Sequence, residues 1–306
     1  MGQRKYIRTK FGGIEMKRRG LIFWLVIICL SMSGCGNLSD DLLPDKLEEE
    51  KINVSVDEDI VGNTYVEKDY EYTILEDMTV EISAYIGNEK TVTVPETIGD
   101  YQVTRIGTRA FEGTDIESIT IPKGVETIGE RAFQSCVNLK RVKISDGVRK
   151  AEWGIFNGSD NIISIEIPDS LIYVDGFGLN SDSNLYRYYG GLKYLGNIVV
   201  GFDTSTIKEG KTEISFDEET TAIAMVALRA ESYMITNTDI IFPESLKVIG
   251  QDAFAGQFCI ETMRFLSEPE CIENCGINSK IKIYGPECDS IKAYSVKQGN
   301  QYVIVE

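Results

Sequence analysis

Histidine is missing from this sequence of 306 residues. Its absence excludes Ser-His-Asp and Cys-His nucleophilic sites, histidine-coordinated zinc and the commonest general base at neutral pH. Paired carboxylates could still carry hydrolytic chemistry, but no spacing singles out two of the 48 Asp and Glu residues. We therefore expect a protein that is not an enzyme, with no catalytic residues, no metal and no cofactor.

Positive charge is also scarce. The chain carries 31 Lys and Arg against 48 Asp and Glu, a net charge of −17. Seven of the basic residues and only Glu15 among the acidic ones lie in residues 1–34, so the remainder holds 24 against 47, a net charge of −23. Such a charge repels phosphate backbones and anionic lipid surfaces, which argues against nucleic acid as a partner.

No apolar run near the start is long enough to cross a bilayer, which takes about 20 residues. The run Leu21–Leu30 has ten, follows a basic stretch and precedes Ser31-Met32-Ser33-Gly34-Cys35. This order predicts an export signal over residues 1–34. Either Met1 or Met16 could be its true start.

The end of that signal, Met32-Ser33-Gly34-Cys35, resembles a bacterial lipobox, whose cysteine is lipidated and becomes the first residue after cleavage. The resemblance implies a lipid on Cys35 and a position on the extracellular face of the bacterial cell membrane, where the lipid is the contact with the membrane. The alternative is an ordinary secretory signal cut near Gly34.

Residues 35–70 lack a sustained helical or strand period. They are rich in acids, including Glu48-Glu49-Glu50 and Asp57-Glu58-Asp59. Such a composition buries too little apolar surface to offset the entropy of ordering, and like charges extend the chain. We predict a flexible acidic tether here.

From there on, apolar residues recur in units of about 22 to 24 positions. The units share the spacing Ala-Phe-x5-(Leu or Ile)-x2-apolar-x-(Ile or Phe)-Pro, which is clearest in Ile119–Ile144, Ile144–Pro168 and Phe242–Phe265. A fixed period of this length is typical of a solenoid. A propeller is disfavoured because its blades repeat at about 40 to 45 residues.

Each unit contains a strand signal and a turn signal. Ser118-Ile119-Thr120-Ile121 alternates apolar and polar side chains, and Pro122 ends the pairing. A glycine follows the next Ile, where the chain needs either a positive φ or a close backbone approach; these glycines are Gly107, Gly129 and Gly250.

One unit cannot bury enough apolar surface to fold alone, so the units must stack. The phenylalanines of the repeat should then form a ladder inside the stack: Phe111, Phe133, Phe156 and Phe254. Ser290–Lys297 has a helical apolar stripe that ends at Gly299-Asn300. The predicted fold is a mainly β repeat solenoid, a leucine-rich-repeat-like stack of short strands and turns with a C-terminal capping helix.

The repeats resemble the BspA-like leucine-rich repeats of bacterial surface proteins. Thr93–Gly107 is similar to the first unit of that family, Lys282–Gly285 and the segment up to Asn300 to its last, and the resemblance covers about Tyr72 to Val305. It implies a leucine-rich repeat domain over residues 71–306 and a role in adhesion or in binding host or matrix proteins. It implies no catalytic residue.

The array is interrupted. Regular units cover about residues 94–174 and 240–285, an irregular insertion covers about 177–239, and a C-terminal cap covers 286–306. The insertion reads as two short strands around Gly-rich turns, and it carries the candidate binding surface: Tyr186, Tyr188, Tyr189 and Tyr194. Tyrosine is a good recognition residue, but alternate tyrosines on a strand more often pack onto the neighbouring coil.

Five cysteines follow Cys35. Cys136 lies three residues after Phe133 and reads as a buried core thiol. The other four form a pool for one or two disulfides outside the cytosol, with free thiols or a zinc site as alternatives; they are Cys259, Cys271, Cys275 and Cys288.

These features predict a lipid-anchored surface protein that recognises a protein on a host, in a matrix or on a neighbouring cell. A glycan-binding module that uses the tyrosines is one alternative. A structural surface component with no soluble ligand is another. The sequence identifies neither the ligand nor the face that binds it.

The lipid anchor is tested by Cys35→Ser. Without the thiol no acyl chain can be attached, so the variant should be released into the medium or stay unprocessed, and fractionation with an immunoblot checks this. Retention in the membrane at the mature size would rule out lipidation at Cys35.

Overall fold

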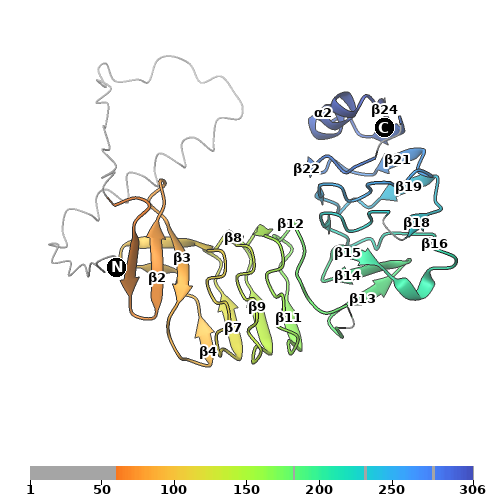
Figure 1. Ribbon diagram of the computed structural model, residues 1–306. Helices are drawn as coiled ribbons and strands as arrows, with labels where there is room; N and C mark the ends of the chain where they lie inside the picture. The colour runs from red at the N-terminus through yellow and green to blue at the C-terminus, as the bar shows by residue number, and fades with distance from the viewer. Residues whose placement is uncertain (1–59, 182, 231–232, 278–279, 306) are drawn as a thin grey trace, which may run out of the picture. The chain divides into compact units, whose positions relative to one another are not determined.

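The computed structural model describes residues 60–181, 183–230, 233–277 and 280–305 (Figure 1). They form stacked coils of short strands, which confirms the predicted mainly β solenoid. The export signal, Cys35 and most of the predicted tether lie outside the described residues.

The first stack spans residues 64–174. Its strands are β1 (Thr64–Glu67), β2 (Tyr70–Ile74), β3 (Val80–Tyr85), β4 (Thr91–Thr93), β5 (Thr97–Ile98), β6 (Tyr101–Ile106), β7 (Ser118–Ile121), β8 (Thr127–Ile128), β9 (Arg141–Ile144), β10 (Lys150–Ala151), β11 (Ser164–Glu166) and β12 (Tyr173–Val174). One sheet has the order β1-β2-β3-β6-β8-β10-β12, with β5 paired to β6. The other, called here the β7 sheet, has the order β4-β7-β9-β11.

The fold begins earlier than the sequence predicts. Strand β1 lies inside the predicted tether and pairs antiparallel with β2. The ring of Tyr65 packs against that of Tyr72, with the centroids 5.7 Å apart. This hairpin covers the first coil of the stack, so a tether can include at most the residues before β1.

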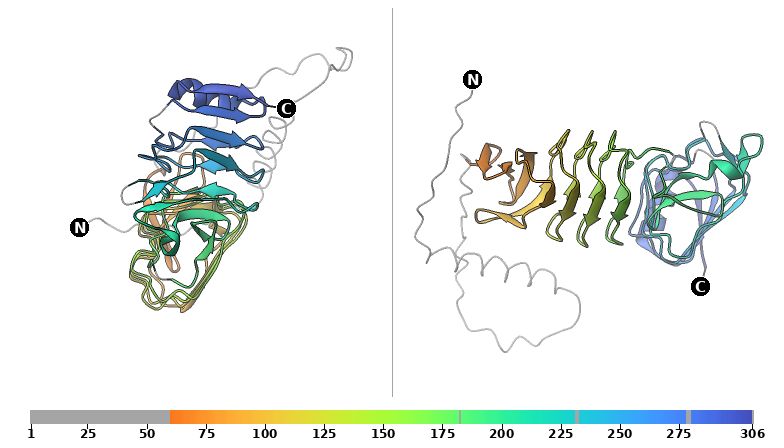
Figure 2. Two further views of the ribbon diagram at one scale, coloured as in Figure 1. Left: turned by 90° about the vertical axis from the view of Figure 1, so that its right-hand side faces the viewer. Right: turned by 90° about the horizontal axis from the view of Figure 1, so that it is seen from below.

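Each coil of the first stack contributes one strand to each sheet, and the coils pair in register. Ile119 of β7 lies beside Val142 of β9, which lies beside Ile165 of β11. Figure 2 shows these yellow to green strands one behind the next. Parallel pairing at this register points the apolar positions of every coil into the same core.

The predicted phenylalanine ladder is present in the first stack. Rings of Tyr85, Phe111, Phe133 and Phe156 follow one another with centroids 5.1, 5.2 and 5.7 Å apart. Phe254 does not continue it, because it belongs to a later stack, where its ring meets Phe242 edge-on at 6.1 Å.

The repeated glycines serve close backbone approach. A Cβ on Gly129 would lie 2.7 Å from the backbone nitrogen of Thr108, and one on Gly250 would lie 2.7 Å from that of Met225. The positive φ falls two residues after Gly107, Gly129 and Gly250, at Arg109 (57°), Arg131 (53°) and Asp252 (55°). Val226 (54°) holds the same position in the coil where Ala224 replaces the glycine. A recurrent left-handed residue thus lets each coil turn.

A second recurrent hydrogen-bonding position lies three residues after Phe133, Phe156 and Phe254. The thiol of Cys136 donates to the carbonyl of Phe111 at 3.0 Å, and the hydroxyl of Ser159 donates to that of Phe133 at 2.7 Å. In the second stack the amide of Gln257 donates to the carbonyl of Leu228 at 2.7 Å. These side chains are buried and bind the backbone of the preceding coil, so Cys136 is the core thiol that the sequence predicts.

The second stack spans residues 187–304. Its elements are β13 (Arg187–Tyr189), β14 (Leu192–Leu195), β15 (Ile198–Phe202), η1 (Thr204–Thr206), β16 (Lys211–Thr212), β17 (Ala222–Ile223), β18 (Met234–Ile235), β19 (Asp239–Phe242), β20 (Val248–Ile249), β21 (Thr262–Phe265), β22 (Cys271–Ile272), β23 (Lys282–Gly285), α2 (Asp289–Gln298) and β24 (Gln301–Ile304). One sheet has the order β13-β14-β15-β17-β20-β22, and β16 pairs with β18. The remaining sheet, called here the β19 sheet, has the order β19-β21-β23-β24.

The two stacks meet where the repeat fails. Leu195, Ile198 and Ala222 of the second stack pack into the core cluster of the first. The backbone N–H of Met225 donates to the carbonyl of Val174 at 2.9 Å. In the part of the chain that the structure describes, neither β11 nor β12 is followed by a further strand in its own sheet. The interruption therefore ends one array and starts another.

The C-terminal helix is present. It is α2, which ends at Gly299 in the left-handed conformation with φ 69° and buries Ile291 and Tyr294. The sequence does not predict the last strand, β24, which pairs parallel with β23 and extends the β19 sheet.

The backbone strain at Val226 is testable. A β-branched residue is poorly suited to the left-handed region, whereas asparagine adopts it readily. We expect Val226→Asn to raise the free energy of unfolding by about 1 kcal/mol, measured by urea denaturation. Val137→Asn, at an exposed valine without a positive φ, is the control; an equal effect of both changes would show that no strain is relieved.

Candidate functional site

The tyrosine-bearing insertion forms three antiparallel strands, β13, β14 and β15, one more than the sequence suggests. Gly190 and Gly191 make the first turn with φ of 56° and 78°, a two-residue turn that suits a hairpin. A Cβ on Gly190 would lie 2.2 Å from the carbonyl oxygen of Ser215. The turn is therefore pressed against the next coil, which holds the hairpin in place.

Tyr194 is part of the core. Its side chain is fully buried, its hydroxyl shares a 3.2 Å hydrogen bond with that of Thr220, and the backbone N–H of Asp217 donates to it at 3.2 Å. Burial raises the pKa of this hydroxyl. The guanidinium of Arg187 lies 4.7 Å from the ring and pairs with Asp217 at 2.6 Å. These contacts leave Tyr194 unable to meet a ligand.

Tyr186 is half-buried. Its hydroxyl donates to the carbonyl of Leu179 at 3.4 Å, and the ammonium of Lys193 lies 4.6 Å from the ring centroid. Burial is the main cause, and the neighbouring Tyr188 the second, that raises the pKa of Tyr186 to about 12. Its ring is mainly a packing element that holds the segment before β13.

Tyr188 and Tyr189 are the exposed pair, each with 48% of its surface accessible. Successive strand residues point to opposite faces, and the register sets Tyr188 opposite Lys193 and Tyr189 opposite the buried Leu192. The hairpin therefore does not gather the four tyrosines on one surface. Only Tyr188 and Tyr189 are available to a partner, and they face different ways.

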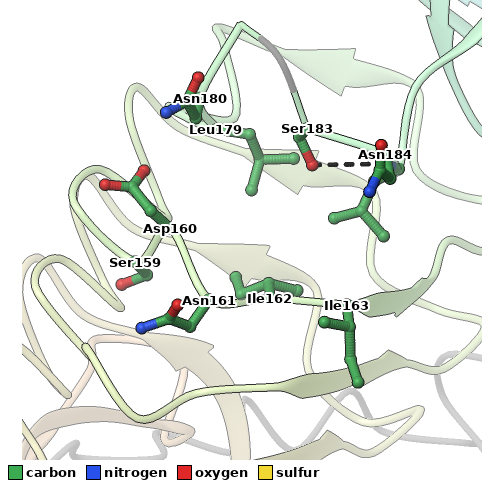
Figure 3. A pocket seen from close by; sticks show the side chains of 10 residues that line it. Ser159, Asp160, Asn161, Ile162, Ile163, Leu179, Asn180, Ser183 and Asn184 are labelled. Carbon is green, nitrogen blue, oxygen red and sulfur yellow. Dashed lines mark hydrogen bonds between the residues drawn. The ribbon is translucent and has the colours of Figure 1, made fainter.

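A pocket of about 380 Å³ lies close to Tyr186. Figure 3 shows its two walls, one from the corner before β11 and one from the segment before β13. Its lining mixes amides, hydroxyls and a carboxylate with apolar side chains: Ser159, Asp160, Asn161, Ile162, Ile163, Leu179, Asn180, Ser183, Asn184 and Leu185. Such a lining suits a polar ligand with one apolar face.

The β19 sheet carries a surface that the sequence pattern did not reveal. In register across β19, β21, β23 and β24 lie Ile241, Arg264, Tyr284 and Val303, called here the exposed row. Ile241 is the exposed member, and the other three side chains are half-buried. Arg264 pairs with Asp239 at 3.0 Å, and its guanidinium lies 4.3 Å from the Tyr284 ring. Ile241 is 53% exposed. The row thus offers apolar, cationic and aromatic groups on a rigid sheet.

The equivalent row of the β7 sheet is purely polar. Thr93, Thr120, Lys143 and Glu166 lie side by side there, and Lys143 pairs with Glu166 at 3.1 Å. The difference between the two rows could have been found in the sequence. Each strand contributes to its row the residue that lies between its two inward-facing residues. In Ile240-Ile241-Phe242-Pro243, Ile241 is an apolar residue at a position where a polar one is expected.

No disulfide joins the five cysteines after Cys35 in the described residues. Cys275 is buried, and burial raises its pKa to about 11; it shares a 2.9 Å hydrogen bond with the hydroxyl of Tyr294 in α2. Cys271 lies beside Tyr173 of the first stack. Its pKa is raised mainly by burial and, to a smaller extent, by the negative charge of Glu273. The disulfide pairing of Cys259, Cys271, Cys275 and Cys288 stays a prediction.

Two other features are absent from the described part of the chain. It holds no group of three or more His, Cys, Asp or Glu residues placed to bind a metal ion. Nor does it contain a helix with both the length and the apolar character needed to cross a membrane.

Comparison with known proteins agrees with a solenoid of leucine-rich repeats. The BspA type leucine rich repeat region matches in six copies, over residues 92–198 and 204–301. No curated protein matches the chain. The chain belongs to the BspA-type leucine-rich repeat family.

Several solved leucine-rich repeat proteins of bacteria are similar to this chain. One from Bacteroides capillosus is 29% identical, with 40% of this chain and 92% of that one covered and a TM-score of 0.35. One from T. pallidum is 18% identical, with 79% and 98% covered and a TM-score of 0.37. One from Bacteroides ovatus is 21% identical, with 79% and 76% covered and a TM-score of 0.38.

The division of the tyrosines into packing and exposed residues is testable by stability. Tyr194→Phe removes a buried hydroxyl and leaves the N–H of Asp217 unsatisfied, so it should cost about 1 to 2 kcal/mol. Tyr189→Phe should change the free energy of unfolding by less than about 0.5 kcal/mol. Urea denaturation of both variants checks this, and equal stability of the two would refute the packing role of Tyr194.

Proposed function

We propose that this protein is displayed on the outer face of the bacterial cell membrane, held by a lipid on Cys35, and binds a protein partner through the exposed row of the β19 sheet. The observation that carries the proposal is the composition of that row. Ile241, Arg264 and Tyr284 stand in register on neighbouring strands, where solvent-facing positions of a sheet are normally polar.

These residue types are those that dominate protein interfaces. Aromatic residues and arginine are enriched at binding hot spots, because they bury much surface and lose few rotamers. Arg264 is already oriented by Asp239 and stacked on Tyr284, so little entropy is lost on binding. Leu266, 56% exposed just after β21, enlarges the apolar area next to the row.

The net charge supports a protein ligand over a polyanion. A chain with a net charge of −17 repels nucleic acid and anionic polysaccharides at long range. A partner with a basic or neutral surface meets no such barrier. Tyr188 and Tyr189 offer further contact area on the hairpin, as one part of the predicted tyrosine surface.

A neutral glycan is the second candidate, and the pocket before β11 favours it. Asp160 and Asn161 at its wall supply planar polar groups, and Ile163, 71% exposed, supplies an apolar platform. Sugars combine hydroxyls with apolar faces and need both. The ring of Tyr186 lies close by but is engaged with Lys193, so it adds little.

Binding of the full-length chain to immobilised host and matrix proteins, and to a glycan array, tests the proposal. Arg264→Ala and Tyr284→Ala should each weaken protein binding by about tenfold or more, as hot-spot truncations do. Lys143→Ala is the matched control, because Lys143 holds the equivalent position of the β7 sheet and has the same kind of ion pair.

Three other outcomes would contradict the proposal. Equal loss in the Lys143→Ala variant would show a general electrostatic effect. Saturable binding to a glycan that is lost in Asn161→Ala, with no protein bound, would favour the glycan module. No binding to any immobilised protein or glycan would favour a structural component without a soluble ligand.

A further inference from the structure

The β19 sheet has an open edge that the interruption creates. Among the described residues, strand β19 pairs only with β21 and is the first strand of its sheet. The preceding coil brings Ile214 and Phe216 to the positions that Ile240 and Phe242 hold one repeat later, and the rings of Phe216 and Phe242 lie 5.4 Å apart. Yet no ladder joins that coil to β19.

At one point the side chain of Asn237 makes the hydrogen bonds that a neighbouring strand would make to the preceding coil. Its carbonyl oxygen accepts from the backbone N–H of Ile214 at 2.8 Å, and its amide donates to the carbonyl of Ile214 at 3.1 Å. One amide thus imitates one peptide group of a neighbouring strand. After β19 the two coils are joined again, because the hydroxyl of Ser245 donates to the carbonyls of Glu218 and Thr220 at 2.6 and 2.8 Å.

The space between them is a groove of about 360 Å³. Its lining is mainly apolar, with polar groups at the margin: Ile214, Ser215, Phe216, Glu218, Asn237, Asp239, Ile240, Ile241, Pro243 and Leu266. Ile214 and Ile240 are buried at its base, whereas Ile241 and Leu266 are more than half exposed. The groove leads directly from the exposed row.

Backbone groups face this groove. The carbonyl of Thr238 accepts from the N–H of Thr262 at 2.9 Å and so points toward β21. In a parallel strand, the N–H and C=O of successive residues point to alternate sides. Asp239 and Ile241 therefore turn their peptide groups away from β21 and toward the groove, where an added strand would bind them.

The margin of the groove is negatively charged. Glu218 and Asp239 line it, and Glu244 follows Pro243 at its end. Arg264 neutralises Asp239, but within the described residues no cation pairs with Glu218 or Glu244. A ligand strand that brings lysine or arginine to this margin would be attracted, and an acidic one would be repelled.

We infer that this groove binds an extended segment of a partner protein in which basic residues alternate with apolar ones. The segment adds to β19 as a parallel or antiparallel strand, a mode in which main-chain bonds give affinity and alternate side chains give specificity. Its apolar side chains enter the space between Ile214 and Ile241, and its basic side chains reach Glu218 and Glu244.

The inference rests on the proposed function, since it specifies which part of the partner protein binds to the β19 sheet. A second copy of this chain is a poor occupant, because the chain is strongly acidic overall. The exposed row and the groove are continuous through Ile241. A partner could therefore use both at once.

The test uses the full-length chain in mild detergent and a synthetic nine-residue peptide that alternates lysine with valine, with binding followed by fluorescence anisotropy. The peptide should bind, and its counterpart that alternates glutamate with valine should not. N-methylation of every second peptide nitrogen, tried on each of the two edges, should weaken binding by about tenfold for one edge only, since about three main-chain bonds are lost.

The protein variants are Ile241→Ser and the double change Glu218→Gln with Glu244→Gln. The first should weaken peptide binding by about tenfold through loss of apolar contact. The second should weaken it by a similar factor at low salt and have less effect at high salt, where the charges are screened. Ile163→Ser, at an exposed isoleucine beside the open edge of β11, is the control and should bind normally.

The outcomes separate this inference from the proposed function. No binding of the lysine-valine peptide, or equal loss on methylation of both edges, would overturn strand addition at β19. The proposed function would still stand if a protein ligand were found whose binding depends on Arg264 and Tyr284. Peptide binding that survives Ile241→Ser but falls in Ile163→Ser would place the added strand on β11 and overturn the assignment.

Discussion

The contact between one coil and the next is the interaction on which the structure depends. No coil encloses a core of its own, so each must cover the apolar side chains of its neighbour. The stacked rings of Phe111, Phe133 and Phe156 are the visible part of that contact. Gly129 lets the backbones approach closely. Cys136 and Ser159 donate to carbonyl groups of the preceding coil, so that no buried polar group is left without a partner at these positions.

Dependence on neighbours also explains why the interruption matters. Where the repeat fails, a coil loses its partner on one side, and the structure must cover the exposed surface by other means. The hairpin of β14 and β15 covers the core at the end of the first stack. The sheets are less completely covered: β11 and β19 each keep one edge without a strand, and a pocket lies beside each edge. Open edges are normally avoided, and an edge strand with a pocket beside it is a surface fit for recognition.

The candidate site was only partly predictable. The tyrosines marked the right segment, but alternation along the strands divides them, so that Tyr194 enters the core while Tyr188 stays exposed. Their sequence spacing could not reveal this, because it depends on which face of the hairpin meets the next coil. The exposed row was visible in principle, since Ile241 stands where Lys143 and Arg264 stand in other repeats. The composition of the row as a surface depends on the strand register, which places Arg264 over the ring of Tyr284.

The sequence was enough to predict the repeat, its period, the inward positions, the phenylalanine ladder of the first stack and the helix near the C-terminus. These are local or periodic properties, and each residue type has one role that a coil of this length can give it. The folded chain was needed to show where the array breaks, which glycine approaches which backbone, and which polar positions come together on one sheet. Those features arise from pairs of residues about one repeat or more apart, whose meeting is set by packing and register rather than by the chain between them.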